Sequence, residues 1–204
     1  MKNNFKTIPF MIAICVIGFT TVLRAQTNYK VAESKNNNMK LSGTSTLHDW
    51  TMNAQVFSSE SQFVVKDHQI SSLKTLSFSL AVTDLKSGES GLDKNAYKAL
   101  GSGDHKNITY KLSSATITPD GSKFLVKTRG NLTIAGVTKE VTIDVNAVVN
   151  ADETITCTGS EKLNMTDYQV KPPKFMLGAM KTGDAITLDF TLVYKNNQLI
   201  SKSN

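Results

Sequence analysis

The chain has 204 residues, of which 40% are hydrophobic, and it carries 23 basic against 17 acidic side chains. This length suits one β-barrel or sandwich domain, and the apolar content is high enough for a true hydrophobic core. The basic excess does not indicate a nucleic-acid partner, because the basic residues are scattered along the chain instead of clustered.

The N-terminal residues 1–25 are predicted to be a secretory signal peptide. Lys2 and Lys6 precede an apolar run over residues 8–22, and Ala25 is a small residue at the expected cleavage point. This pattern is typical of a leader that directs export and is then removed.

An N-terminal membrane anchor is the alternative, because Leu23, at the third position before the cut, is bulkier than the small residue usually found there, and the apolar run is near the short end of the lengths that span a membrane. We favour cleavage, which makes residues 26–204 one exported domain, periplasmic or secreted. This domain holds 20 basic and 17 acidic side chains, a net charge of +3.

Removal of the leader also removes Cys15 and leaves Cys157 as the single cysteine. A lone cysteine cannot form an internal disulfide in an oxidising compartment. Cys157 shares its phase with Ile155 in an alternating segment, so we expect a free, buried thiol.

Most of the exported chain alternates apolar and polar residues with a period of two, which is typical of half-buried strands. Residues 130–149 are predicted to form a β-hairpin with a turn at residues 135–140, where Gly136 tolerates a positive φ. About eight antiparallel strands are expected, and closure into an all-β barrel would leave no exposed edge. The segments with strand character are residues 39–47, 50–56, 62–66, 73–83, 108–112, 115–118, 123–134, 141–149, 154–163 and 186–194.

Two segments interrupt the β pattern. Residues 89–100 place apolar side chains at helical spacing and end at Gly101, so a short amphipathic helix is expected there. Residues 167–183 contain Pro172 and Pro173 with an apolar cluster and predict a long ordered loop or lid.

Catalytic and metal-binding patterns are weak. Ser45, His48 and Asp49 suggest a hydrolase, but neighbouring side chains of an extended chain point apart and no third group orients the imidazole. His48, His68 and His105 lie in separate segments without ligand spacing. We therefore expect no enzyme activity, no cofactor and no metal.

Four motifs in order resemble the YceI-like family, and together they span nearly the whole exported chain. They are residues 43–51 (GTSTLHDWT), residues 92–100 (LDKNAYKAL) followed by 108–110 (ITY), residues 130–139 (GNLTIAGVTK), and the MTD, KPPK and KTGD segments of residues 165–184.

The resemblance implies a closed, lipocalin-like antiparallel β-barrel that is exported to the periplasm. It also implies that the lumen holds a long apolar lipid, a polyisoprenoid or an isoprenoid quinone-like molecule, for transport, storage or stress protection. The alternative is a barrel with a filled core that acts as a periplasmic stress or interaction factor without a ligand, with a hydrolase as the weakest alternative. A homodimer is left open.

The candidate ligand-binding residues form two groups. Side chains in the apolar phase of the strands are expected to point into the lumen: Leu76, Phe78, Leu80, Phe124, Val126, Val141, Ile143, Ile186, Leu188 and Phe190. Side chains in the two interruptions are expected to frame the mouth: Leu92, Tyr97, Leu100, Phe175, Met176 and Met180. Three lysines beside the second group could meet an anionic head group or form a solvated charge cluster: Lys171, Lys174 and Lys181.

Overall fold

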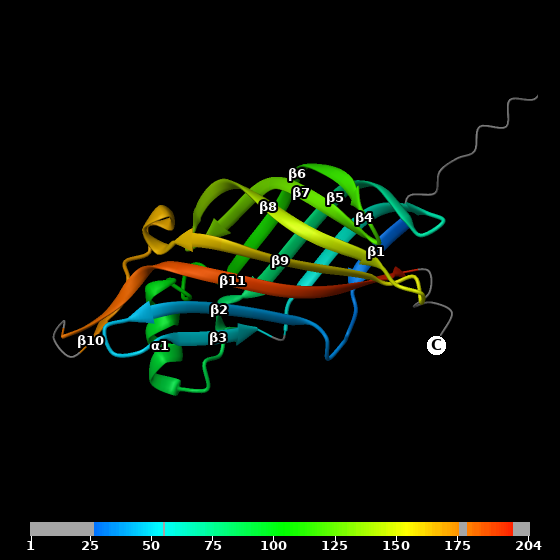
Figure 1. Ribbon diagram of the computed structural model, residues 1–204. Coiled ribbons are helices and arrows are strands. Elements are labelled where there is room, and N and C mark those ends of the chain that lie inside the picture. The colour runs from blue at the N-terminus through cyan, green and yellow to red at the C-terminus, as the bar shows by residue number, and fades with distance from the viewer. Residues whose placement is uncertain (1–26, 55, 176–178, 198–204) are drawn as a thin grey trace, which may run out of the picture.

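Figure 1 shows the computed structural model of the protein, which describes residues 27–54, 56–175 and 179–197. The predicted signal peptide lies outside the described residues. The strands are β1 (Thr27–Val31), β2 (Asn38–Ser45), β3 (Trp50–Ala54), β4 (Ser58–Lys66), β5 (Gln69–Ala81), β6 (Asn107–Asp120), β7 (Lys123–Ile134), β8 (Val137–Val149), β9 (Ile155–Asn164), β10 (Lys174–Phe175) and β11 (Met180–Asn196). The helices are the 3-10 turns η1 (Val82–Asp84) and η2 (Met165–Tyr168) and the α-helix α1 (Ser90–Ala99).

Eight strands form a closed antiparallel ring, which confirms the predicted fold class. Their order is β1-β4-β5-β6-β7-β8-β9-β11, and a pairing between β1 and β11 closes the ring. All neighbouring strands run antiparallel. Closure removes the exposed edges of these eight strands, and β2 and β3 extend the sheet beyond the ring.

The long strand β11 carries a second hairpin on the edge that it shares with β1. Residues 194–196 of β11 pair with β1, whereas residues 182–191 pair with β2, and β3 follows β2. A bridge between Asn53 and Lys86 ties β3 to the segment that follows β5. The β2–β3 hairpin therefore completes the wall of the barrel beside residues 182–191 of β11 (Figure 1).

The hairpin of β7 and β8 confirms the predicted pairing but has a shorter turn. Ala135 and Gly136 alone connect the strands, with φ angles of 48° and 79°. Two consecutive positive φ angles are typical of a type I′ turn, whose twist matches that of the flanking strands.

Three other details differ from the sequence prediction. Strand β1 was not predicted, residues 108–112 and 115–118 belong to the single strand β6 with an irregularity between Leu112 and Ser114, and β10 pairs with the start of β11 inside the expected loop. A bulge interrupts the alternation of apolar residues without ending a strand, so it resembles a loop in the sequence.

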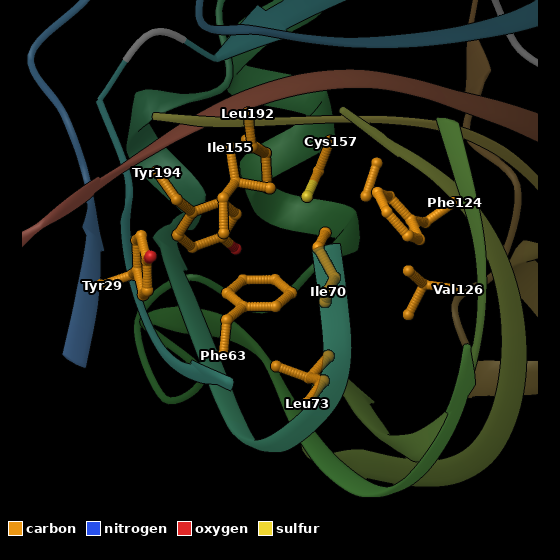
Figure 2. Packing of buried hydrophobic residues seen from close by; sticks show 11 residues of the cluster. Tyr29, Phe63, Ile70, Leu73, Phe124, Val126, Ile155, Cys157, Leu192 and Tyr194 are labelled. Carbon is orange, nitrogen blue, oxygen red and sulfur yellow. The ribbon is translucent and has the colours of Figure 1, made fainter. Parts of the chain in front are cut away.

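One end of the barrel is filled with side chains. Phe63 is 1% exposed and makes edge-to-face contacts with Tyr29 and Tyr194, at centroid distances of 5.7 and 5.8 Å. Ser59 and the hydroxyl group of Tyr194 share a hydrogen bond of 2.8 Å. Figure 2 shows these aromatic side chains and the surrounding aliphatic ones. They come from different strands of the barrel and point toward one another.

Cys157 lies in this packed end, buried and free of disulfides among the described residues. Burial raises the pKa of the thiol to about 12. Because only the thiolate reacts with common thiol reagents, labelling of the native protein at pH 8 is expected to be roughly 1,000-fold slower than labelling of the unfolded chain. Equal rates measured with and without denaturant would contradict this packing.

The α-helix α1 lies at the opposite end, beside the β2–β3 hairpin (Figure 1). The predicted helix is therefore confirmed, and it packs Leu92, Ala96 and Leu100 against the apolar side chains of β2, β3 and the segment after β5. No described helix is long and apolar enough to cross a membrane.

Candidate ligand-binding cavity

A cavity of about 350 Å³ opens between α1, the β2–β3 hairpin and the first residues of β11. Its floor is apolar and includes Leu41, Trp50, Met52 and Leu92. Polar side chains line it as well: Ser45, His48, Glu89, Asn95, Asn164 and Thr182. Its volume lies within the range of about 300–1,000 Å³ that is common for ligand sites. We call it the outer cavity.

A second cavity of about 170 Å³ lies inside the barrel, and we call it the inner cavity. Its walls are almost entirely apolar, and it ends on the packed core at Phe63, Leu73 and Tyr194. Five residues line both cavities: Leu41, Leu85, Leu100, Ile134 and Ile186. The two cavities therefore adjoin, and together they lead from the end of the barrel beside α1 to the packed core.

The structure places most of the predicted lumen residues along the inner cavity. Eight of them line it: Leu76, Phe78, Leu80, Val126, Ile143, Ile186, Leu188 and Phe190. Phe124 and Val141 do not line it. Phe124 is buried in the packed end, and Val141 packs against the cluster that contains Tyr168. These two residues lie at other positions along the barrel than the cavity does. The apolar–polar alternation of the sequence gives the face of a strand on which a residue lies, but not its position along the barrel.

The predicted mouth residues divide in a similar way. Leu92, Leu100 and Met180 line the outer cavity. Tyr97 does not, because its hydroxyl group donates to the carbonyl oxygen of Leu85 at 2.7 Å and accepts a hydrogen bond from Lys86 at 2.9 Å. Tyr97 thus fastens α1 to the segment after β5.

The remaining mouth residues belong to the β10–β11 hairpin. The backbone of Phe175 pairs with that of Met180, but the side chain of Phe175 and the whole of Met176 lie outside the described part of the chain. Lys174 and Lys181 are directly opposite each other on this hairpin, and both are exposed.

Sequence reasoning missed Trp50, which lines the outer cavity. Its indole nitrogen donates to the carbonyl oxygen of Thr44 at 3.1 Å, and the ring lies over Gly43, its partner in β2. The glycine leaves room for the ring, since an added Cβ would lie 2.7 Å from Cε2 of Trp50. Because β2 and β3 are half polar, they were not expected to contribute side chains to the cavity. The pairing of a glycine with a tryptophan on neighbouring strands could have indicated that the Trp50 ring lies over Gly43.

Replacing Gly43 with alanine is expected to displace the Trp50 ring and to destabilise the protein by about 1–3 kcal/mol, the usual cost of overpacking. The fluorescence emission of Trp50, the single tryptophan of the chain, would shift at the same time. Gly91→Ala is the matched control, because an added Cβ at this position of α1 meets no atom within 4 Å. An unchanged emission spectrum in Gly43→Ala would contradict the contact.

Ser45 and His48 form a turn, with their polar atoms bound to the backbone. The hydroxyl group of Ser45 donates to the carbonyl oxygen of His48 at 2.7 Å and accepts from the backbone N–H groups of Leu47 and His48. Nδ1 of His48 lies 2.8 Å from the carbonyl oxygen of Asp49 and must donate to it. The serine and the imidazole are not hydrogen-bonded to each other, so the arrangement lacks the geometry of a nucleophile and its base.

No group of three or more metal-ligating side chains occurs among residues 27–54, 56–175 and 179–197. His68 lies in the β4–β5 turn with a φ of 59°, and His105 packs against the Ala135–Gly136 turn. The three histidines therefore lie in three separate places, as their sequence positions predict.

An eight-stranded ring, packed at one end and hollow at the other, defines a lipocalin-like barrel. The YceI-like domain model matches residues 27–194, and the chain belongs to this family. No curated protein matches the sequence.

Solved structures share the fold at low sequence identity. Burkholderia cenocepacia BcnA has a TM-score of 0.64 and 18% identity, over 80% of this chain and 98% of its own. A polyisoprenoid binding domain from Saccharophagus degradans, implicated in plant cell wall breakdown, has a TM-score of 0.62 and 13% identity, over 82% and 98%. The Campylobacter jejuni YceI protein has a TM-score of 0.56 and 19% identity, over 72% and 84%.

Proposed function

We propose that this protein binds one long apolar lipid, an isoprenoid chain, in the joined outer and inner cavities. The observation that carries the proposal is that the two cavities adjoin, since five residues line both. A linear chain that enters beside α1 would pass along the apolar residues of the outer cavity into the inner cavity and end at the packed core. Family membership and the polyisoprenoid binding domain from Saccharophagus degradans support the same ligand class.

The energetics of burial favour a long ligand over a short one. Burial of one methylene group contributes about 0.8 kcal/mol, so a four-carbon tail gains roughly 3 kcal/mol. Association costs about 4–15 kcal/mol in lost translational and rotational freedom, which exceeds that gain. Only a chain that fills both cavities offsets this cost, because the walls of the inner cavity are almost entirely apolar and offer few hydrogen bonds.

The proposed role is that of an exported carrier, store or protective binder of the lipid and not that of an enzyme. Ser45 and His48, the residues that suggested a hydrolase, are bound to backbone groups in a turn. The competing proposal of a filled barrel without a ligand is disfavoured by the inner cavity, whose volume of about 170 Å³ exceeds that of a packing defect.

Titration of the delipidated protein with prenols of increasing length tests the proposal, with Trp50 in the cavity wall as the fluorescent probe. We expect saturable binding at one site and an affinity that rises with each added isoprene unit until both cavities are filled. A response that is the same for every length, or that is absent, would contradict the proposal.

A further inference from the structure

Strands β8 and β9 separate along half of their length. Their pairing runs from Val149 and Ile155 to Val145 and Gly159 and then stops, although β9 continues to Asn164. The 3-10 turn η2 and the residues after it cover the gap, with Tyr168 and Val170 only 3% and 5% exposed. The wall of the barrel is therefore completed here by side chains instead of by backbone pairing.

Glu161 lies on the lumen side of β9 at this gap. It is directly opposite Leu188 in β11, whose side chain lines the inner cavity, and Glu161 lines the same cavity. Among the described residues its carboxylate has no hydrogen bond or ion pair. A half-buried carboxylate in an apolar cavity is costly unless a partner satisfies it. Burial raises the pKa of this group, and the charge of Asp144 adds to the effect.

Tyr168 supplies a second polar group without a partner. Its side chain lines the outer cavity, and its hydroxyl group makes no hydrogen bond within the described part of the protein. The turn that positions it is fixed, because Thr166 donates from its backbone N–H and its hydroxyl group to the carboxylate of Asp184, at 2.9 and 2.6 Å. Burial raises the pKa of Tyr168, with smaller contributions from Asp167 and Glu161, so the phenol remains a donor.

We propose that Glu161, which lines the inner cavity, and Tyr168, which lines the outer cavity, form a polar recognition point where the two cavities adjoin. This point selects an uncharged lipid carrying a hydroxyl group, a prenol, over a prenyl phosphate. This inference rests on the proposed function and names its ligand class. A hydroxyl group can donate to the carboxylate and accept from the phenol, so it satisfies both.

A phosphate group does not fit the same point. At neutral pH a prenyl phosphate carries a charge of about −1.5 to −2, and in the cavity it would meet the negative charge of Glu161. Lys127 lies 3.7 Å from Asp144, but this pair is on the outer surface with both side chains more than half exposed. Like charges brought together in an apolar site disfavour binding strongly.

Competition between two probes of equal chain length tests the inference. The full delipidated protein is titrated with geranylgeraniol and with geranylgeranyl monophosphate, and Trp50 fluorescence reports binding. The wild type is expected to bind the alcohol at least about tenfold more tightly. Glu161→Gln should raise the affinity for the phosphate about tenfold. Tyr168→Phe should weaken alcohol binding by about two- to tenfold, the usual effect of one hydrogen bond.

Glu60→Gln is the matched control, since Glu60 pairs with Lys30 on the outer surface and its loss changes the net charge equally. Wild-type behaviour of this control is expected. Equal or tighter binding of the phosphate by the wild type would overturn the inference, whether or not the variants fold, while leaving the proposed function intact. Binding of neither probe would overturn the proposed function itself.

Discussion

Replacing Ile186 with tryptophan is expected to abolish lipid binding while leaving the barrel folded. Ile186 lines both cavities at the point where they adjoin, and it is directly opposite Leu163 on one side and Gly43 on the other. The larger side chain would occupy the passage between the outer and inner cavities. The affinity for a long prenol should fall at least about tenfold, a loss of about 1.4 kcal/mol or more.

Ala185→Trp provides the control, because Ala185 is the neighbouring residue of β11, exposed on the other face of the strand. Both variants should give the circular dichroism spectrum of the wild type, and lipid content per protein, measured by mass spectrometry, should fall in Ile186→Trp alone. Normal lipid content in a folded Ile186→Trp protein would show that the ligand does not pass this point.

Replacing Phe63 with alanine is expected to destabilise the delipidated protein by about 3–5 kcal/mol. The ring is almost fully buried between Tyr29 and Tyr194, so its removal leaves a void in the packed end of the barrel. Figure 2 shows Phe63 between the rings of Tyr29 and Tyr194. Urea unfolding followed by circular dichroism measures the loss.

Leu188→Ala is the informative comparison. Leu188 is only partly buried and borders the inner cavity, so one side of its side chain lacks packing partners. Its replacement should cost less than about 2 kcal/mol, below the usual range for a buried leucine. Equal losses at Phe63 and Leu188 would indicate a barrel that is filled along its whole length.

The period-two pattern of the sequence was sufficient for the barrel and for the direction of most side chains. Alternation from Leu76 to Leu80 fixes which face of β5 is apolar, and a closed ring has only one interior for that face. The same pattern cannot separate Phe78 from Phe124, since both are in the apolar phase. Only the position along the barrel axis decides that one lines the cavity and the other fills the packed end.

Strand β1, the wall residues Tyr168 and Val170, and Glu161 were not predicted, each for a local reason. Strand β1 is five residues long and has a single buried side chain, Tyr29, so its period is too short to detect. Tyr168 and Val170 complete the wall where β8 and β9 separate. No pattern in the sequence indicates that these two strands separate there. Glu161 was missed because an acidic residue on the lumen side breaks the apolar pattern that identified its neighbours.

The most direct test of a lipid-filled barrel is native mass spectrometry of the intact protein, as purified and after incubation with a long prenol. We expect the folded protein to carry one lipid molecule, and the lipids of the purified sample to differ in mass by whole isoprene units. Folded protein that carries no lipid in either sample would contradict this expectation.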